Sequence, residues 1–155
     1  MKIKDLYEKI RDGIIISDIE LQREIIYNPE KQKLVIDSIL NDVPLPAFYL
    51  WENEDKKLEV LDGKQRIESI KKFIENDLQY NGKIWKQTAP EIQEKFNSTE
   101  LSVITCSGTE ELKRKIFNRI NTLGIPLSAY EVLNGLYNGE YLRGLTSYVS
   151  QDKDA

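Results

Sequence analysis

The chain has 155 residues, 40% hydrophobic and 31% charged, with a formal net charge of −4 and a sequence pI of about 5.1. These values predict one globular domain with a substantial core, and no apolar run is long enough to span a membrane. With no histidine and one cysteine, Cys106, the chain excludes histidine-based catalysis, histidine-ligated zinc, an HNH nuclease centre of its own and internal disulfides. The acidic balance argues against strong autonomous DNA binding through phosphate contacts.

The N-terminal part predicts two helices separated by a short strand and an irregular segment. Apolar residues recur at helical spacing over residues 3–11, and a buried strand at 14–16 follows. Residues 18–27 show no regular pattern. Asn28 is a typical N-cap and Pro29 a typical first helical residue, so the second helix begins there. The charged N-terminus lacks the apolar segment of a signal peptide, which together with the single thiol predicts a cytoplasmic protein.

The second helix leads into a predicted β-hairpin. Four residues are expected on the inner face of this helix: Leu34, Val35, Ser38 and Ile39. Pro44 and Pro46 end the helix. A strand over 47–51, a turn at 53–55 and a strand that ends at Asp62 then predict the hairpin.

Residues 58–73 are the most informative stretch, because an apolar strand runs through Asp62 and Gly63 directly into a helix. The helix is predicted from four apolar residues at helical spacing: Ile67, Ile70, Phe73 and Ile74. Such a junction directs backbone N–H groups and the positive end of a helix dipole at one point, which suits an anion such as phosphate. Gln65 and Arg66 add a carboxamide and a guanidinium there.

The side chains of this junction support two interpretations. In the first, Asp62 holds a metal ion or a ribose, Gln65 a base or a water molecule, and Arg66 a phosphate. Arg66 lies in the first helical turn, where the dipole disfavours a positive charge unless an anion answers it. In the second, a tight Asp-Gly turn precedes an ordinary helix with solvated charges.

The following elements are shorter. An Asn-Gly pair within residues 78–85 predicts a second small hairpin, and a short helix is expected over 90–96. Residues 101–106 are apolar and β-branched, which predicts a central strand with Cys106 as a buried, inert thiol.

Two capping boxes predict the last helices. Ser107 with Glu110 begins one helix, and Ser128 with Glu131 begins another that runs to about residue 138. The first of these helices carries four basic residues with acidic neighbours, which we interpret as a solvated face: Lys113, Arg114, Lys115 and Arg119.

Three blocks of residues resemble one known family. The first contains Gln22, Arg23, Tyr27, Ser38, Ile39, Pro44 and Pro46; the second is DGKQR at 62–66; the third contains Phe117, Arg119, Asn121, Pro126, Leu127, Ser128 and Glu131. Together they cover residues 20 to about 138 and resemble the N-terminal domain of GmrSD-type restriction endonucleases, whose signature is DGQQR. Two positions depart from the pattern. Lys64 replaces the first glutamine of the signature, and Tyr27 stands where the family often has tryptophan.

The resemblance implies an α+β fold with a ParB/sulfiredoxin-like core, in which helices flank a small mixed sheet and a helical C-terminal extension follows. Residues 1–127 would form the nucleotide-binding core. Residues 128–155 would begin the extension, which this chain truncates unless the protein is a stand-alone sensor. No cysteine stands at the junction, so a sulfiredoxin-type redox activity is not supported.

The resemblance also implies a function: a nucleotide-binding, NTP-hydrolysing regulatory domain of a restriction system that targets modified DNA in phage defence. Mg²⁺ and a nucleoside triphosphate are the implied cofactors, with Asp62, Gln65 and Arg66 in catalytic roles and Asp62 as the metal ligand. Five further residues are implied in nucleotide binding: Gln22, Arg23, Gly63, Lys64 and Asn121. The implied partners are DNA, in the full-length system, and a C-terminal or separate HNH-type nuclease domain, with no membrane.

An alternative function is a ParB-like module that binds DNA or protein without hydrolysis. Nuclease activity of this chain alone is not expected, since it needs a cluster of carboxylates around metal and only Asp62 is a candidate. No G-x-x-x-x-G-K-[ST] motif occurs, so an NTPase of the P-loop type is not indicated.

Overall fold

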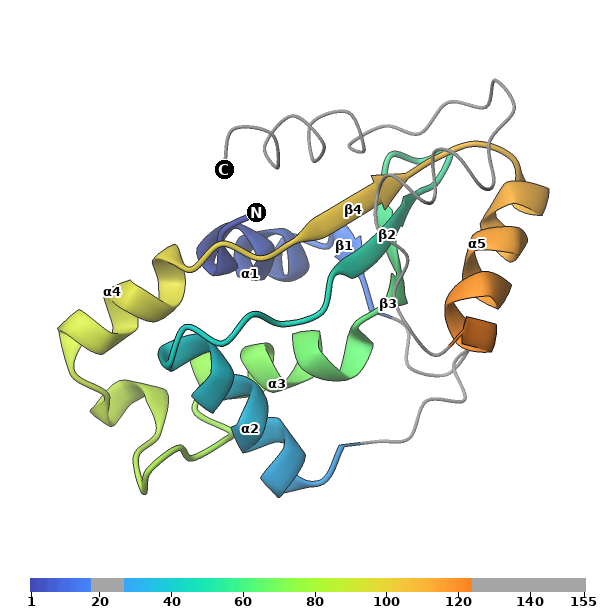
Figure 1. Cartoon of the computed structure of the whole chain (residues 1–155). Coiled ribbons are helices and arrows are strands. Elements are labelled where there is room, and N and C mark those ends of the chain that lie inside the picture. Colours follow the sequence, from blue (N-terminus) through green and yellow to red (C-terminus); the bar gives the residue numbers. More distant parts are fainter. Residues whose placement is uncertain (18–26, 124–155) are drawn as a thin grey trace, which may run out of the picture.

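The computed structural model describes residues 1–17 and 27–123, drawn in colour in Figure 1. Its elements in chain order are α1 (Ile3–Arg11), β1 (Ile15–Ile16), α2 (Pro29–Leu40), β2 (Phe48–Glu52), β3 (Leu58–Asp62), α3 (Lys64–Ile74), the 3₁₀ helix η2 (Trp85–Gln87), α4 (Pro90–Ser98), β4 (Val103–Cys106) and α5 (Glu110–Leu123). The helices predicted over residues 3–11 and from Pro29 are confirmed, as is the hairpin that ends at Asp62. The capping box at Ser128 lies outside the described residues. No helix in the described part is long and apolar enough to cross a membrane.

The four strands form one mixed sheet in the order β1-β3-β2-β4. β2 and β3 pair antiparallel as the hairpin, while β1 runs parallel to β3 and β4 runs parallel to β2. The α+β class with a small mixed sheet is thus confirmed. The prediction that residues 101–106 form a central strand is wrong, because β4 lies at an edge of the described sheet. Its burial comes from packing on both faces instead.

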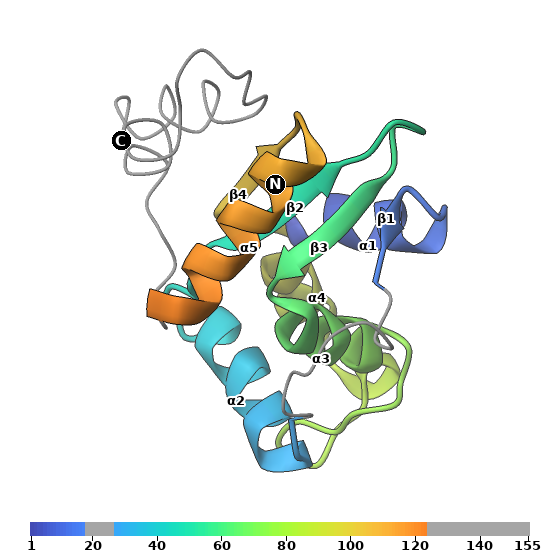
Figure 2. The same ribbon diagram turned by 90° about the vertical axis from the view of Figure 1, so that its right-hand side faces the viewer.

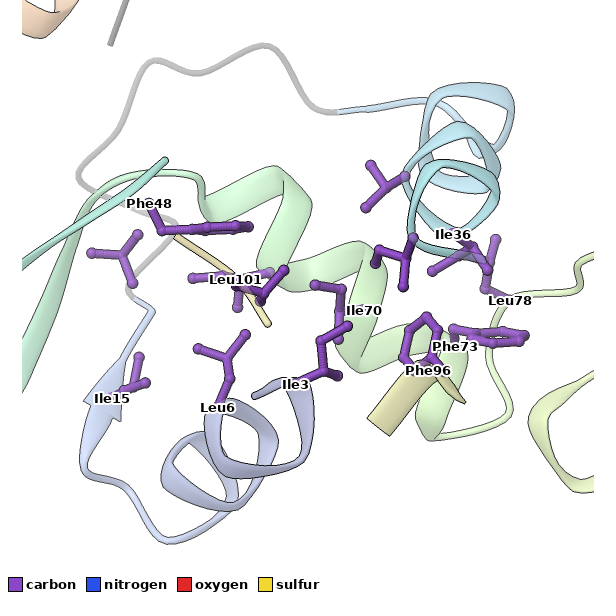
Figure 3. Close-up of a cluster of buried hydrophobic side chains, with 14 of the residues drawn as sticks. Ile3, Leu6, Ile15, Ile36, Phe48, Ile70, Phe73, Leu78, Phe96 and Leu101 are labelled. Carbon is purple, nitrogen blue, oxygen red and sulfur yellow. The ribbon is translucent and has the colours of Figure 1, made fainter. Parts of the chain in front are cut away.

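Helices cover both faces of the sheet, and alternate residues of β2 enter different cores. Phe48 and Leu50 of β2 pack into one cluster with α1, α2, α3 and α4, whereas Tyr49 and Trp51 pack into a second cluster with α5. Figure 3 shows the first cluster, and Figures 1 and 2 show α5 on the opposite side of the sheet from α3. Buried Cys106 belongs to the second cluster, and its burial raises the pKa of the thiol to about 12.

Side-chain caps mark the start of α2 and α5, whereas α1, α3 and α4 begin without one. The Asn28 side chain accepts a hydrogen bond from the Lys31 N–H at 2.9 Å, as the Asn-Pro signal predicts. The cap of α5 is Thr109, whose Oγ1 accepts from the Leu112 N–H at 3.1 Å, and not Ser107 as the capping box predicted. Ser107 and Thr109 are both suitable cap residues and lie two positions apart, so the sequence alone does not decide between them.

Two predictions are only partly confirmed. The inner face of α2 contains Gln32 and Ile36 with Val35 and Ile39, and the predicted core residue Leu34 is 62% exposed. The Asn-Gly turn forms, but only one bridge, between Tyr80 and Lys83, represents the predicted second hairpin.

Candidate functional site

The candidate site begins where β3 ends at Asp62 and α3 begins at Lys64. Gly63 joins them with φ of +104°, a backbone conformation that favours glycine. The first turn of α3 consists of three polar side chains with exposures of only 5%, 8% and 8%: Lys64, Gln65 and Arg66. Polar side chains so buried are uncommon, and burial requires that each be hydrogen-bonded or paired.

Arg66 is held by the protein itself. Its guanidinium donates hydrogen bonds to the Pro46 carbonyl and, at 3.4 Å, to the Ala47 carbonyl. It also forms an ion pair with the Asp62 carboxylate at 3.2 Å and stacks on the Phe48 ring at 4.4 Å. The Asp62 carboxylate therefore compensates the Arg66 charge, which the dipole of α3 disfavours. The position of Arg66 thus does not require a phosphate. Its phosphate and catalytic roles remain predictions.

Gln65 connects the junction to the start of α2. Its Oε1 accepts a hydrogen bond from the Tyr27 N–H at 3.1 Å. Since the carbonyl oxygen is used in this contact, the amide nitrogen is the part of Gln65 suited to a ligand. The role in orienting water or ribose stays a prediction.

Asp62 is a carboxylate in a partly buried setting. Its side chain is 24% exposed, and it pairs with Tyr49 of β2 beside an irregularity at which β3 has one extra residue, Leu61. Burial raises its pKa, an effect that the Arg66 charge and a hydrogen bond from the Gly63 N–H only partly oppose. Among residues 1–17 and 27–123, no three acidic or cysteine side chains converge on a metal position. Asp62 can thus supply one ligand, and Mg²⁺ usually takes one or two carboxylates together with phosphate oxygens and water.

The raised pKa of Asp62 predicts a pH-dependent stability. The folded state holds the proton more tightly than the unfolded chain, so this residue's contribution to stability falls as pH rises from its ordinary pKa of 3.8 through the raised folded value. We expect the difference in unfolding free energy between Asp62→Asn and wild type to shift in favour of the variant over this window and then level off. Urea unfolding at several pH values measures this difference. A difference that is independent of pH contradicts the prediction.

Lys64 lines a cavity of about 530 Å³ beside β3 and α5. The cavity is lined by residues of β1, the hairpin turn, β3, α3 and α5: Ile16, Asn53, Glu59, Val60, Leu61, Lys64, Glu110, Lys113, Arg114 and Phe117. Asp62, Gln65 and Arg66 do not line it. Of the five residues of DGKQR, Lys64 alone lines the cavity.

The solvated face predicted for α5 is confirmed at Arg114, Lys115 and Arg119, which are exposed, but sequence reasoning missed that Lys113 and Arg114 line the cavity. The available signal was the spacing 110, 113, 114 and 117, which places four residues on one helical stripe. Asn121 is exposed in the last turn of α5 and does not line the cavity. Gln22 and Arg23 lie outside the described residues, so their predicted roles stay predictions.

Comparison with known proteins identifies the family to which the chain belongs. No curated protein and no solved structure matches the chain significantly. The profile of the family described as "GmrSD restriction endonuclease, N-terminal domain" matches residues 3–138, which include the whole junction and the cavity. The chain therefore belongs to the family of N-terminal domains of GmrSD restriction endonucleases, and so to proteins of the restriction-type defence class.

Proposed function

We propose that the chain is a nucleotide-binding regulatory domain of its restriction system, and that it hydrolyses a nucleoside triphosphate. The charges in the first turn of α3 support this proposal. Its first turn contains no acidic residue and no side-chain cap, while Lys64 adds a positive charge there beside Arg66, whose own charge is paired with Asp62. Each of the other four α-helices in the described part has an acidic residue in its first turn. A phosphate group is the anion best suited to such an end.

The proposed roles follow from the chemistry of each group. Gly63 lets the backbone approach a phosphate, and Lys64 is a compact charge for it. Asp62 supplies one ligand for Mg²⁺, which when bound would neutralise phosphate charge. Gln65 orients water or ribose through its amide, and Arg66 fixes the Asp62 carboxylate. Phosphoryl transfer depends largely on such positioning and charge stabilisation. Gln22, Arg23 and Asn121 complete the proposed nucleotide contacts.

Calorimetric titration with each of the four ribonucleoside triphosphates, with and without Mg²⁺, tests this function. We expect saturable binding of at least one of them, with Kd below about 1 mM, and release of inorganic phosphate. Asp62→Asn keeps the size of the side chain, and it should lower affinity in Mg²⁺ about tenfold while leaving the metal-free affinity less changed. Asp42→Asn is the matched control, since Asp42 lies on the surface in an ion pair with Lys95 at 3.2 Å.

Failure of all four nucleotides to bind would overturn the nucleotide function. DNA binding whose affinity does not respond to nucleotide would then favour the alternative, a ParB-like binding module without hydrolysis.

A further inference from the structure

The cavity beside α5 has the size and lining of a ligand site. Its volume of about 530 Å³ is within the range of small-molecule pockets, roughly 300–1,000 Å³. Leu61 and Phe117 give it apolar walls from β3 and α5. Lys64 lines it from the first turn of α3, and Lys113 and Arg114 line it from α5, the helix on the right of Figure 1. Positive charge thus reaches the cavity from two separate elements.

The charges in the cavity favour an anion. Three of its lining residues are positive (Lys64, Lys113 and Arg114) and two are negative (Glu59 and Glu110), which gives a net charge of +1. Glu110 and Arg114 are both exposed, so solvent and salt screen their charges, whereas Lys64 is buried and Lys113 half-buried. Arg114 has no ion pair among residues 1–17 and 27–123. The positive end of the α3 dipole adds to the same potential.

Lys113 lies close to two carboxylates, those of Glu59 and Glu110. Its ammonium lies 2.9 Å from Glu59 and 4.0 Å from Glu110. An ammonium group has three N–H donors, so Lys113 can keep its bond to Glu59 and still donate to a ligand oxygen. The Glu59 contact then holds Lys113 in position at the cavity wall.

We propose that this cavity takes the phosphate chain of the ligand, with Lys64, Lys113 and Arg114 as its phosphate contacts. The proposal rests on the proposed function, and it assigns phosphate recognition to the α5 side of the junction, away from Arg66. Two cations from α5 and one from α3 suit a chain of phosphates better than a single phosphate, because they lie on different walls. The apolar walls at Leu61 and Phe117 suit the nucleoside part.

The test compares two neighbouring residues of α5, Arg114 and Lys115. Both residues are exposed, but Arg114→Gln removes a charge that lines the cavity, whereas Lys115→Gln removes one that does not line it and that pairs with Glu111 at 3.5 Å. Both proteins are titrated with sodium tripolyphosphate and with the nucleoside triphosphates. We expect Arg114→Gln to weaken binding of both ligand types about tenfold and Lys115→Gln to change it less than about twofold. Lys64→Gln, which introduces the residue of the DGQQR signature, should weaken binding as Arg114→Gln does.

The outcomes separate this proposal from the proposed function. Nucleotide binding that is equally strong in wild type, Arg114→Gln and Lys64→Gln overturns the cavity assignment and leaves the nucleotide function standing. Tripolyphosphate binding that Arg114→Gln weakens, without binding of any nucleotide, supports the cavity as a polyphosphate site and overturns the nucleotide function. Absence of binding by both ligand types overturns both.

Discussion

Replacement of Gly63 by alanine is expected to lower the free energy of unfolding by about 2–5 kcal/mol. The backbone at Gly63 has φ of +104°, and an L-residue in left-handed backbone costs about 1–2 kcal/mol. A Cβ atom there would lie 2.5 Å from Cδ1 of Phe48. The Phe48 ring is fully buried and carries the Arg66 guanidinium on its face, so it has little room to move. Overpacking of this kind adds about 1–3 kcal/mol.

Gly82→Ala is the matched control for this prediction. Gly82 also has a positive φ, +74°, but a Cβ there would meet no atom within 4 Å. Gly82→Ala should therefore lower the free energy of unfolding only by the cost of the left-handed backbone. Urea unfolding of both variants separates this cost from that of the contact with Phe48. Equal losses in Gly63→Ala and Gly82→Ala would show that contact with Phe48 does not constrain the junction.

The fold was largely predictable where local chemistry determines it. Asn28 and Pro29 mark the start of α2, and Gly63 marks the change from β3 to α3, because capping and backbone conformation depend on adjacent residues. The place of β4 in the sheet was not predictable. An apolar strand is equally compatible with a central position and with an edge covered on both faces, and only tertiary packing decides between them.

The sequence predicts which residues form the candidate site, but it does not predict which neighbours their side chains contact. DGKQR places a carboxylate, an ammonium, a carboxamide and a guanidinium within five positions. Sequence does not reveal that Lys64 lines a cavity while Arg66 donates hydrogen bonds to the Pro46 and Ala47 carbonyls. It does not reveal either that α5 packs along β3, which alone brings Arg114 to the same cavity.

Replacement of Arg66 by alanine is expected to lower the free energy of unfolding by about 2–4 kcal/mol. The substitution would leave the Pro46 and Ala47 carbonyls without their donor and the Asp62 carboxylate without its ion-pair partner. An unsatisfied buried polar group costs about 1–3 kcal/mol, and loss of one member of a buried pair about 3–5 kcal/mol. Because Asp62 is 24% exposed, solvent screens the ion pair, and the loss of Arg66 costs less than the loss of one member of a fully buried pair. Arg66→Lys should recover only part of the loss, since an ammonium cannot reproduce the planar donor fork.

Arg11→Ala provides the control for Arg66→Ala, because Arg11 forms a surface ion pair with Asp12 at 3.2 Å and its loss should cost less than about 1 kcal/mol. Urea unfolding measures all three variants. If Arg66→Ala is as stable as Arg11→Ala, the guanidinium does not hold the junction together, and its charge is available for a ligand phosphate. If Arg66→Ala is strongly destabilised, loss of nucleotide binding in that variant cannot identify a phosphate contact. The function must then be tested through Asp62, Lys64 and Arg114, whose substitutions leave the Arg66 contacts to the Pro46 and Ala47 carbonyls in place.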